Sequence, residues 1–220
     1  IMLLEHSFMS TVPECYAFLP EFGNWLYEQN QTPGYAYLYR LLQFLQWQKR
    51  QRGLTGTRWL LKTPHHLHYP QALATTFPGA KVIQTHRHPL EVIPSYGSMM
   101  CALAAPFTDQ LDRAAMAMHW AHKWQRGLNT TIAARADEAL DLDYLDLAFT
   151  DLLVDPKGQI ERVYRFINEN LTERALQEMA AWQALNTRES RPEHHYTLEE
   201  FGLSEGLINE LFGHYLSHYF

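Results

Sequence analysis

The chain has few cysteines, no excess of positive charge and no long unbroken apolar run. Its 220 residues include two cysteines, Cys15 and Cys101, and no CxxC pair. This excludes a zinc ribbon and a disulfide framework, and favours two buried thiols in a reducing cytoplasm. The net charge is −6. Because nucleic-acid binding usually needs a basic face, we expect no nucleic-acid partner.

Nothing in the sequence predicts a membrane span or a secretory signal. The longest uncharged stretch, residues 92–108, contains Pro94, Gly97 and Pro106, so it is too short and too broken to cross a bilayer. We therefore expect a cytoplasmic protein. The chain opens with the apolar, uncapped residues 1–4, and we expect a further segment to precede it.

The sequence has enough apolar residues, 46% of the chain, to form the core of one large domain. Short apolar runs predict strands over residues 58–62, 81–86 and 142–147. Helical periodicity, caps and breakers predict short helices near Pro13 and Pro20, and longer ones over residues 34–52, 69–77, 89–101, 109–136, 157–170, 172–185 and 204–219. Pro64 is expected to delay the helix before 69–77. The alternation predicts a helix-rich α/β fold, a single domain over residues 1–220 with a parallel sheet covered by helices.

Cations end two of the predicted strands. Lys62 closes the first, Arg87 closes the second, and Ser95 lies on the helix that follows. Ligands of open α/β sheets bind outside the carboxyl ends of the strands, and an Arg fork suits a phosphate. These residues predict an anion site. The alternative is that Arg87 pairs with Glu91 one turn away, that Ser95 faces water and that Lys62 is a surface lysine.

The motifs around these residues resemble those of a known family. Residues 61–67 read LKTPHHL, residues 85–90 read THRHPL, and Pro94-Ser95 follows. They resemble the bacterial branch of the sulfotransferase family, which uses 3′-phosphoadenosine 5′-phosphosulfate as co-substrate. The resemblance implies a P-loop-NTPase-like fold. It also implies that Arg87 and Ser95 hold the 3′-phosphate of the donor and that Lys62 lies near the sulfuryl group.

Two further segments extend the resemblance. Residues 149–156, FTDLLVDP, are similar to the family's YEDLxxDP, with Phe149 in place of the Tyr that packs on adenine. Residues 194–203, HHYTLEEFGL, are similar to the branch's HxYSLEDFGL. The KHG that precedes it in the branch reads Ser-Arg-Pro here, so Arg188 or Arg191 would have to replace a phosphate-contacting lysine.

A glycine-rich loop like the family's GxxRSGTT is missing. Residues 53–57 are rich in Gly and Thr, but they precede a predicted strand instead of following one. We therefore expect the chain to be the C-terminal portion of the full family domain, without its first strand and phosphosulfate loop. The implied function is sulfuryl transfer to a hydroxyl of a small or lipid-like acceptor. The alternative is an inactive fragment or a nucleotide-binding remnant that retains only the 3′-phosphate subsite. A P-loop kinase is disfavoured because no GK[ST] occurs.

Histidines supply the candidate general bases. His66 matches the His of the bacterial motif and His65 is the second candidate, while the alternative is that His66 only orients the following helix. Pairs of His at helical spacing have no third ligand, so we expect no metal. A row of aromatic residues is interpreted as core packing, with an apolar acceptor pocket as the alternative: Tyr35, Tyr37, Tyr39, Phe44 and Trp47.

Overall fold

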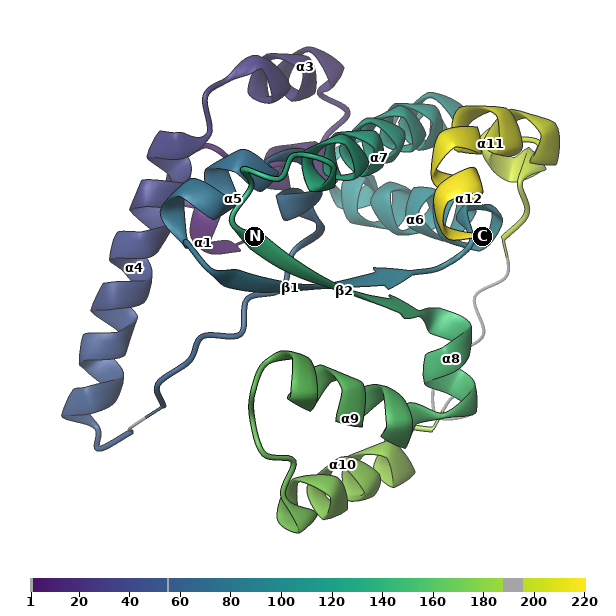
Figure 1. The fold of residues 1–220 in the computed structure, drawn as a ribbon. Helices are drawn as coiled ribbons and strands as arrows, with labels where there is room; N and C mark the ends of the chain where they lie inside the picture. The colour runs from purple at the N-terminus through teal and green to yellow at the C-terminus, as the bar shows by residue number, and fades with distance from the viewer. Residues whose placement is uncertain (1, 55, 188–195) are drawn as a thin grey trace.

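A small parallel sheet lies at the centre of the molecule (Figure 1). The computed structural model describes residues 2–54, 56–187 and 196–220. Within these residues the sheet has two strands, β1 (Ala80–His86) and β2 (Leu142–Ala148). They pair in register from Ala80 with Leu142 to His86 with Ala148. The strands predicted over residues 81–86 and 142–147 are therefore confirmed.

Helices make up most of the remaining described chain. They are α1 (Met2–Glu5), α2 (Val12–Tyr16), α3 (Pro20–Glu28), α4 (Thr32–Gln51), η1 (Pro64–His68), α5 (Pro70–Thr76), α6 (Pro89–Ala104), η2 (Ala105–Phe107), α7 (Arg113–Arg135), α8 (Phe149–Val154), α9 (Pro156–Phe166), α10 (Glu173–Leu185), η4 (Glu199–Phe201), α11 (Glu205–Leu211) and α12 (Gly213–Tyr219).

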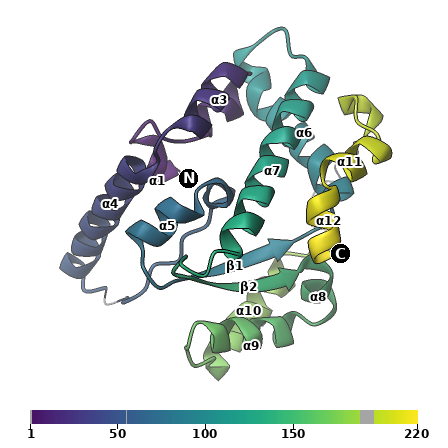
Figure 2. The ribbon, with the colours of Figure 1, turned by 45° about the horizontal axis from the view of Figure 1, so that its top comes forward.

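The helices cover both faces of the sheet. Helices α5, α6 and α7 lie on one face, and α8, α9 and α10 lie on the other (Figures 1 and 2). The largest core cluster joins α6 and α7 to the C-terminal helices through Met100, Trp120, Phe201 and Phe212, each at most 2% exposed. This packing fixes α6, the helix that follows β1, against the rest of the domain.

Most predicted helices are confirmed, with two differences. The predicted helix over residues 204–219 is two helices, α11 and α12, which meet at Phe212 and Gly213. Pro64 does not delay helix formation, because a 3₁₀ turn begins at that residue. Proline suits the first position of a helix, where its missing N–H needs no partner. The side chain of Thr63 caps this turn by accepting from the His65 N–H at 3.2 Å.

The strand predicted over residues 58–62 is wrong. The segment belongs to neither strand of the described sheet, and Leu60 is 88% exposed. Trp59 and Leu61 instead pack against the cluster that joins α1 to α4. The alternation of inward and outward side chains is therefore that of a strand, but the backbone pairs with neither β1 nor β2. Lys62 consequently ends an irregular segment and not a strand.

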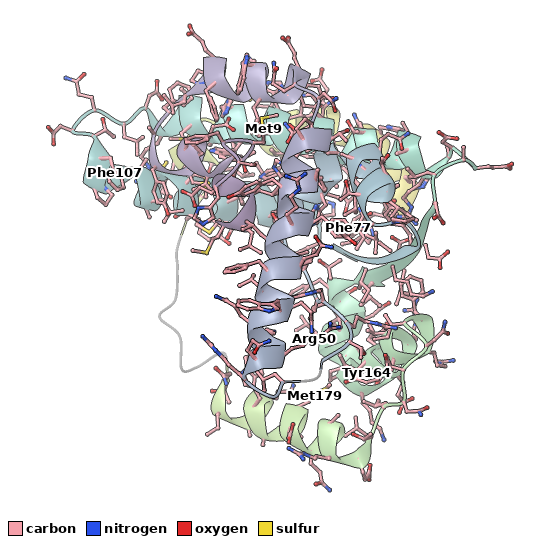
Figure 3. The ribbon with its side chains drawn as sticks, turned by 90° about the vertical axis from the view of Figure 1, so that its left-hand side faces the viewer. Met9, Arg50, Phe77, Phe107, Tyr164 and Met179 are labelled. Carbon is pink, nitrogen blue, oxygen red and sulfur yellow. The ribbon has the colours of Figure 1, made fainter. Side chains whose placement is uncertain are left out.

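The aromatic row on α4 is only partly core. Tyr35 is completely buried, but Tyr37 and Tyr39 are about half exposed, as are Phe44 and Trp47. Figure 3 looks onto α4, with Arg50 near its C-terminal end and side chains projecting outward along the helix. The interpretation as core packing holds for Tyr35 alone. None of the described helices is long and apolar enough to span a lipid bilayer.

Candidate functional site

Two of the predicted site residues meet at the carboxyl edge of the sheet. Arg87 directly follows β1 and Phe149 directly follows β2, one position beyond the paired residues His86 and Ala148. The guanidinium carbon of Arg87 lies 4.7 Å from the centre of the Phe149 ring. A cation and a flat apolar ring therefore lie side by side where parallel strands end, which is the usual ligand position in open α/β sheets.

Arg87 also makes the ion pair that the alternative interpretation expected. Its Nε donates to Oε2 of Glu91 at 2.7 Å, and the two side chains are 41% and 55% exposed. Such exposed (i, i+4) pairs contribute only about 0.3–0.5 kcal/mol. Within the described chain neither Nη atom of Arg87 has a hydrogen-bond partner. The fork thus keeps two nitrogens with which it can bind an anion.

Helix α6 begins at the same strand end and carries Ser95. His88 caps the helix by accepting from the Leu90 N–H at 3.3 Å, and Pro89 occupies its first turn. Ser95 lies two turns into α6, half-buried, and its hydroxyl makes no hydrogen bond to the described residues. The amino end of a helix favours negative charge. A cation and the amino end of a helix therefore lie together at the β1–α6 junction, and Ser95 follows further along the same helix.

The candidate catalytic residues differ sharply in exposure. Lys62 is exposed, whereas His65 is completely buried and neither of its ring nitrogens has a partner in the described structure. His66 is half-buried, and its Nδ1 lies 2.7 Å from the Tyr35 hydroxyl. Burial lowers the pKa of His66 to about 4, and burial also lowers the pKa of His65, with a further contribution from His68. Arg188 and Arg191 lie outside the described residues.

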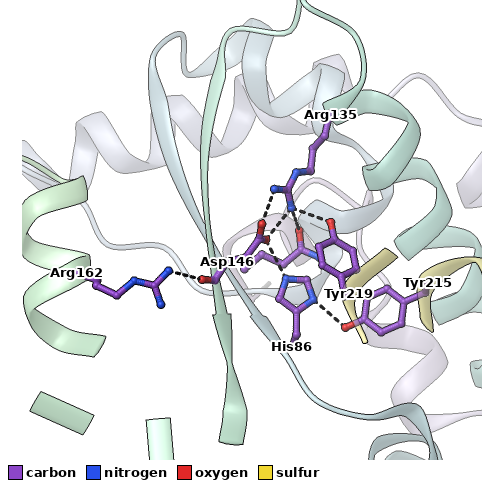
Figure 4. Close-up of polar contacts among 7 residues, drawn as sticks. His86, Arg135, Asp146, Arg162, Tyr215 and Tyr219 are labelled. Carbon is purple, nitrogen blue, oxygen red and sulfur yellow. Dashed lines mark hydrogen bonds and ion pairs between the residues drawn. The ribbon is translucent and has the colours of Figure 1, made fainter. Parts of the chain in front are cut away.

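Sequence reasoning missed a polar network beside this site (Figure 4). Asp146 on β2 receives two hydrogen bonds from the Arg135 guanidinium, at 2.7 and 2.6 Å. The ring of His86 bridges Asp146 at 2.9 Å and the Tyr215 hydroxyl at 2.8 Å. Arg135 also donates to the Tyr219 hydroxyl at 2.8 Å. The network ties α12 and the end of α7 to both strands, immediately before Arg87.

The charges in this network are mutually compensated. Burial raises the pKa of Asp146, but its hydrogen bonds with Arg135 and His86 outweigh that effect and leave the pKa below its ordinary value. Burial lowers the pKa of His86, against the opposing effect of Asp146. The sequence shows Asp146 within a predicted strand, but it does not identify the partners of that carboxylate. We interpret the network as a support for the strand ends, because each of its polar groups is already engaged.

A second buried polar cluster holds α2 against α7. Glu14 is 1% exposed and accepts from Lys123 and from His119, whose Nε2 lies 2.9 Å from the carboxylate. Burial lowers the pKa of Lys123, an effect that Glu14 opposes. His119 is therefore engaged with a carboxylate, whereas His122, three residues further along α7, is exposed.

Two cavities in the described part of the molecule lie away from this site. One of about 610 Å³ opens between α5, α7 and the start of α4, lined by residues that include Gln31, His68 and Asp137. A neighbouring one of about 520 Å³ lies along α7 and includes Tyr27 and Arg126. Neither is lined by Lys62, Arg87, Ser95 or Phe149. The candidate anion site therefore does not coincide with either of these two cavities.

Comparison with known proteins assigns the family. The model of the sulfotransferase family matches residues 1–173. The chain belongs to the sulfotransferase family. The sulfotransferase STF1 from Mycobacterium tuberculosis H37Rv is 30% identical, with a TM-score of 0.77, and the match covers 96% of this chain and 53% of that one. The family resemblance of the motifs around Arg87 is thus confirmed at the level of the family.

A second solved structure supports the fold. The sulfotransferase STF9 from Mycobacterium avium has a TM-score of 0.83 at 24% identity, again over 96% of this chain and 53% of that one. No curated protein sequence matches the chain. This sulfotransferase-family chain therefore spans about half the length of the solved structures it matches, and its helix-rich α/β fold is similar to theirs.

Proposed function

We propose that this chain takes part in sulfuryl transfer from 3′-phosphoadenosine 5′-phosphosulfate to a hydroxyl group of a small or lipid-like acceptor. Arg87 and Ser95 bind the 3′-phosphate of the donor, and Phe149 packs against its adenine. Lys62 and His66 lie on the segment that approaches the sulfuryl group. Arg188 and Arg191 remain candidates for additional phosphate contacts.

The observation that carries this proposal is the contact between Arg87 and Phe149 at 4.7 Å. A nucleotide with a 3′-phosphate presents a dianion next to a flat heterocycle, and this pair offers a fork for the first and a ring for the second. The Glu91 carboxylate occupies only Nε of the fork. Because Glu91 is exposed and weakly held, a phosphate competes with it at little cost.

A binding protein without transfer activity is the second candidate. Neither β1 nor β2 leads into a glycine-rich turn, since β1 is followed by Arg87-His88-Pro89 and β2 by Phe149-Thr150. Sulfuryl transfer depends mainly on positioning and on stabilising charge around the moving group, as phosphoryl transfer does. A chain that binds the 3′-phosphate but cannot cradle the phosphosulfate would bind the desulfonated nucleotide and transfer nothing.

Two assays on the full chain separate these functions. Calorimetry with adenosine 3′,5′-bisphosphate measures the shared nucleotide site. Transfer of ³⁵S-labelled sulfate from the donor to a panel of phenols and long-chain alcohols measures the chemistry. Binding with transfer supports the enzyme, and binding alone supports the remnant. Absence of binding would overturn both, because each depends on the same phosphate subsite.

A further inference from the structure

The hydrogen bond between Tyr35 and His66 restricts what His66 can do. Tyr35 lies on α4 and is completely buried, while His66 lies on η1, and their side chains meet at 2.7 Å between the phenol oxygen and Nδ1. The two rings are 5.6 Å apart at 52°. The contact joins residues 31 positions apart, so it depends on the packing of α4 against η1 and not on local chain geometry.

The protonation states of Tyr35 and His66 limit the possible directions of this hydrogen bond to two. Burial raises the pKa of Tyr35, so the phenol keeps its hydrogen. His66 is neutral above pH 4, since burial lowers its pKa to about 4. One hydrogen therefore lies between the two atoms, and it belongs either to the phenol or to Nδ1.

The two arrangements differ in what they leave unpaired. If Nδ1 carried the hydrogen and donated it, the phenol hydrogen of Tyr35 would need another acceptor. Within the described residues His66 is the only hydrogen-bond partner of that hydroxyl, and the Tyr35 side chain is fully buried. Leaving a buried donor unpaired is unfavourable enough to suppress that arrangement by about tenfold or more.

We propose that Tyr35 donates to Nδ1 of His66 and thereby fixes the imidazole with its hydrogen on Nε2, so that His66 is a hydrogen-bond donor and not a general base. Nδ1 is blocked by the phenol, and Nε2 already carries a proton. Neither nitrogen can accept the proton of an acceptor alcohol. The ring instead offers Nε2–H to an oxygen acceptor such as a sulfuryl or phosphate oxygen.

Tyr35 is then a positioning residue that acts through His66. A hydrogen bond to one ring nitrogen commonly selects the tautomer of a histidine in this way. His65 and His68, by contrast, have no partner at either ring nitrogen within the described structure, so no side chain selects their tautomer. The chemical consequence for transfer rests on the proposed function, whereas the tautomer itself does not.

Nitrogen NMR of the ¹⁵N-labelled full chain at pH 7 tests the proposal without any nucleotide. The imidazole signals of His66 are assigned by their disappearance in His66→Gln. We expect them to show an unprotonated Nδ1 and a protonated Nε2. In Tyr35→Phe the preference of about tenfold or more should shrink to within about threefold. Tyr69→Phe is the matched control, because the Tyr69 ring lies 4.8 Å from His65 and its hydroxyl donates to the Leu26 carbonyl at 3.3 Å.

The outcomes are decisive in each direction. A protonated Nδ1 in the wild-type chain would overturn the proposal, even if Tyr35→Phe failed to fold. An unchanged His66 pattern in folded Tyr35→Phe would also overturn it, because some other feature would then set the tautomer. Failure of adenosine 3′,5′-bisphosphate to bind would remove the proposed function but leave the tautomer result standing.

Discussion

Mild acid should destabilise this protein, because three histidines within residues 65–68 are packed as neutral rings. Burial lowers the pKa of His66 to about 4 and that of His68 to about 3, and it lowers the pKa of His65 as well. In the unfolded chain each returns to about 6.5. The unfolded state therefore binds more protons below pH 6.5, and the free energy of unfolding falls as pH falls toward 4.

The magnitude follows from proton linkage. Between pH 7 and pH 5 each histidine that stays neutral in the folded state should lower the free energy of unfolding by about 2 kcal/mol, and the three together by about 6 kcal/mol. Urea unfolding at the two pH values measures this difference. His68→Gln should reduce the loss by about one third. His122→Gln is the control, because His122 is exposed. A free energy of unfolding that changes by less than about 1 kcal/mol between the two pH values would refute the reasoning.

Two substitution pairs test the packing and the polar network, both by urea unfolding. A Cβ at Gly127 would lie 2.7 Å from Cε1 of His68. In Gly127→Ala this steric overlap should cost about 1–3 kcal/mol of stability, against which the higher helix propensity of Ala contributes about 1 kcal/mol. Gly206→Ala, where the new Cβ meets nothing within 4 Å, should show only the gain, and equal effects would contradict the predicted clash. Asp146→Asn should cost about 1–3 kcal/mol because it weakens two charged hydrogen bonds. Asp143 lies on the same strand but is 67% exposed in its pair with Lys81, so Asp143→Asn should cost less than about 1 kcal/mol. Equal costs of Asp146→Asn and Asp143→Asn would show that the network contributes no more stability than an exposed ion pair.

The sequence predicted the strands over residues 81–86 and 142–147, and with the first of them the position of Arg87 at a strand end. Local apolar runs were enough for that. Phe149 was a candidate only through the family resemblance, and parallel pairing explains why it lies beside Arg87. Residues 58–62 carry the same local signal but pair with neither described strand, since a strand forms only where a neighbour supplies hydrogen bonds. The alternation of Trp59 and Leu61 could not reveal whether such a neighbour exists.

The contacts that define chemistry were harder to foresee because they join distant parts of the chain. Asp146 depends on Arg135 from α7 and on His86 from β1, which come together only after the helices pack. Tyr35 was read as one of several core aromatics. Its bond to His66 depends on how α4 lies against η1. A motif can locate a candidate base, but the tautomer of that base is set by tertiary packing.

Nucleotide binding by the Arg87 fork is best measured by calorimetric titration with adenosine 3′,5′-bisphosphate. Arg87→Ala should weaken binding by about 10- to 150-fold, which corresponds to about 1.5–3 kcal/mol for a charged hydrogen bond. Arg174→Ala is the matched control, because Arg174 pairs with Glu178 through the same Nε–Oε contact at 2.7 Å one turn along α10. The affinity of Arg174→Ala for adenosine 3′,5′-bisphosphate should equal that of the wild type.

Glu91→Gln extends this titration, since it removes the carboxylate that shares the fork. It should tighten binding by no more than about twofold, the worth of an exposed ion pair. We therefore expect a large loss of nucleotide affinity in Arg87→Ala, no loss in Arg174→Ala and a small gain in Glu91→Gln. Equal affinities of Arg87→Ala and the wild type would show that the guanidinium at the end of β1 does not hold the 3′-phosphate.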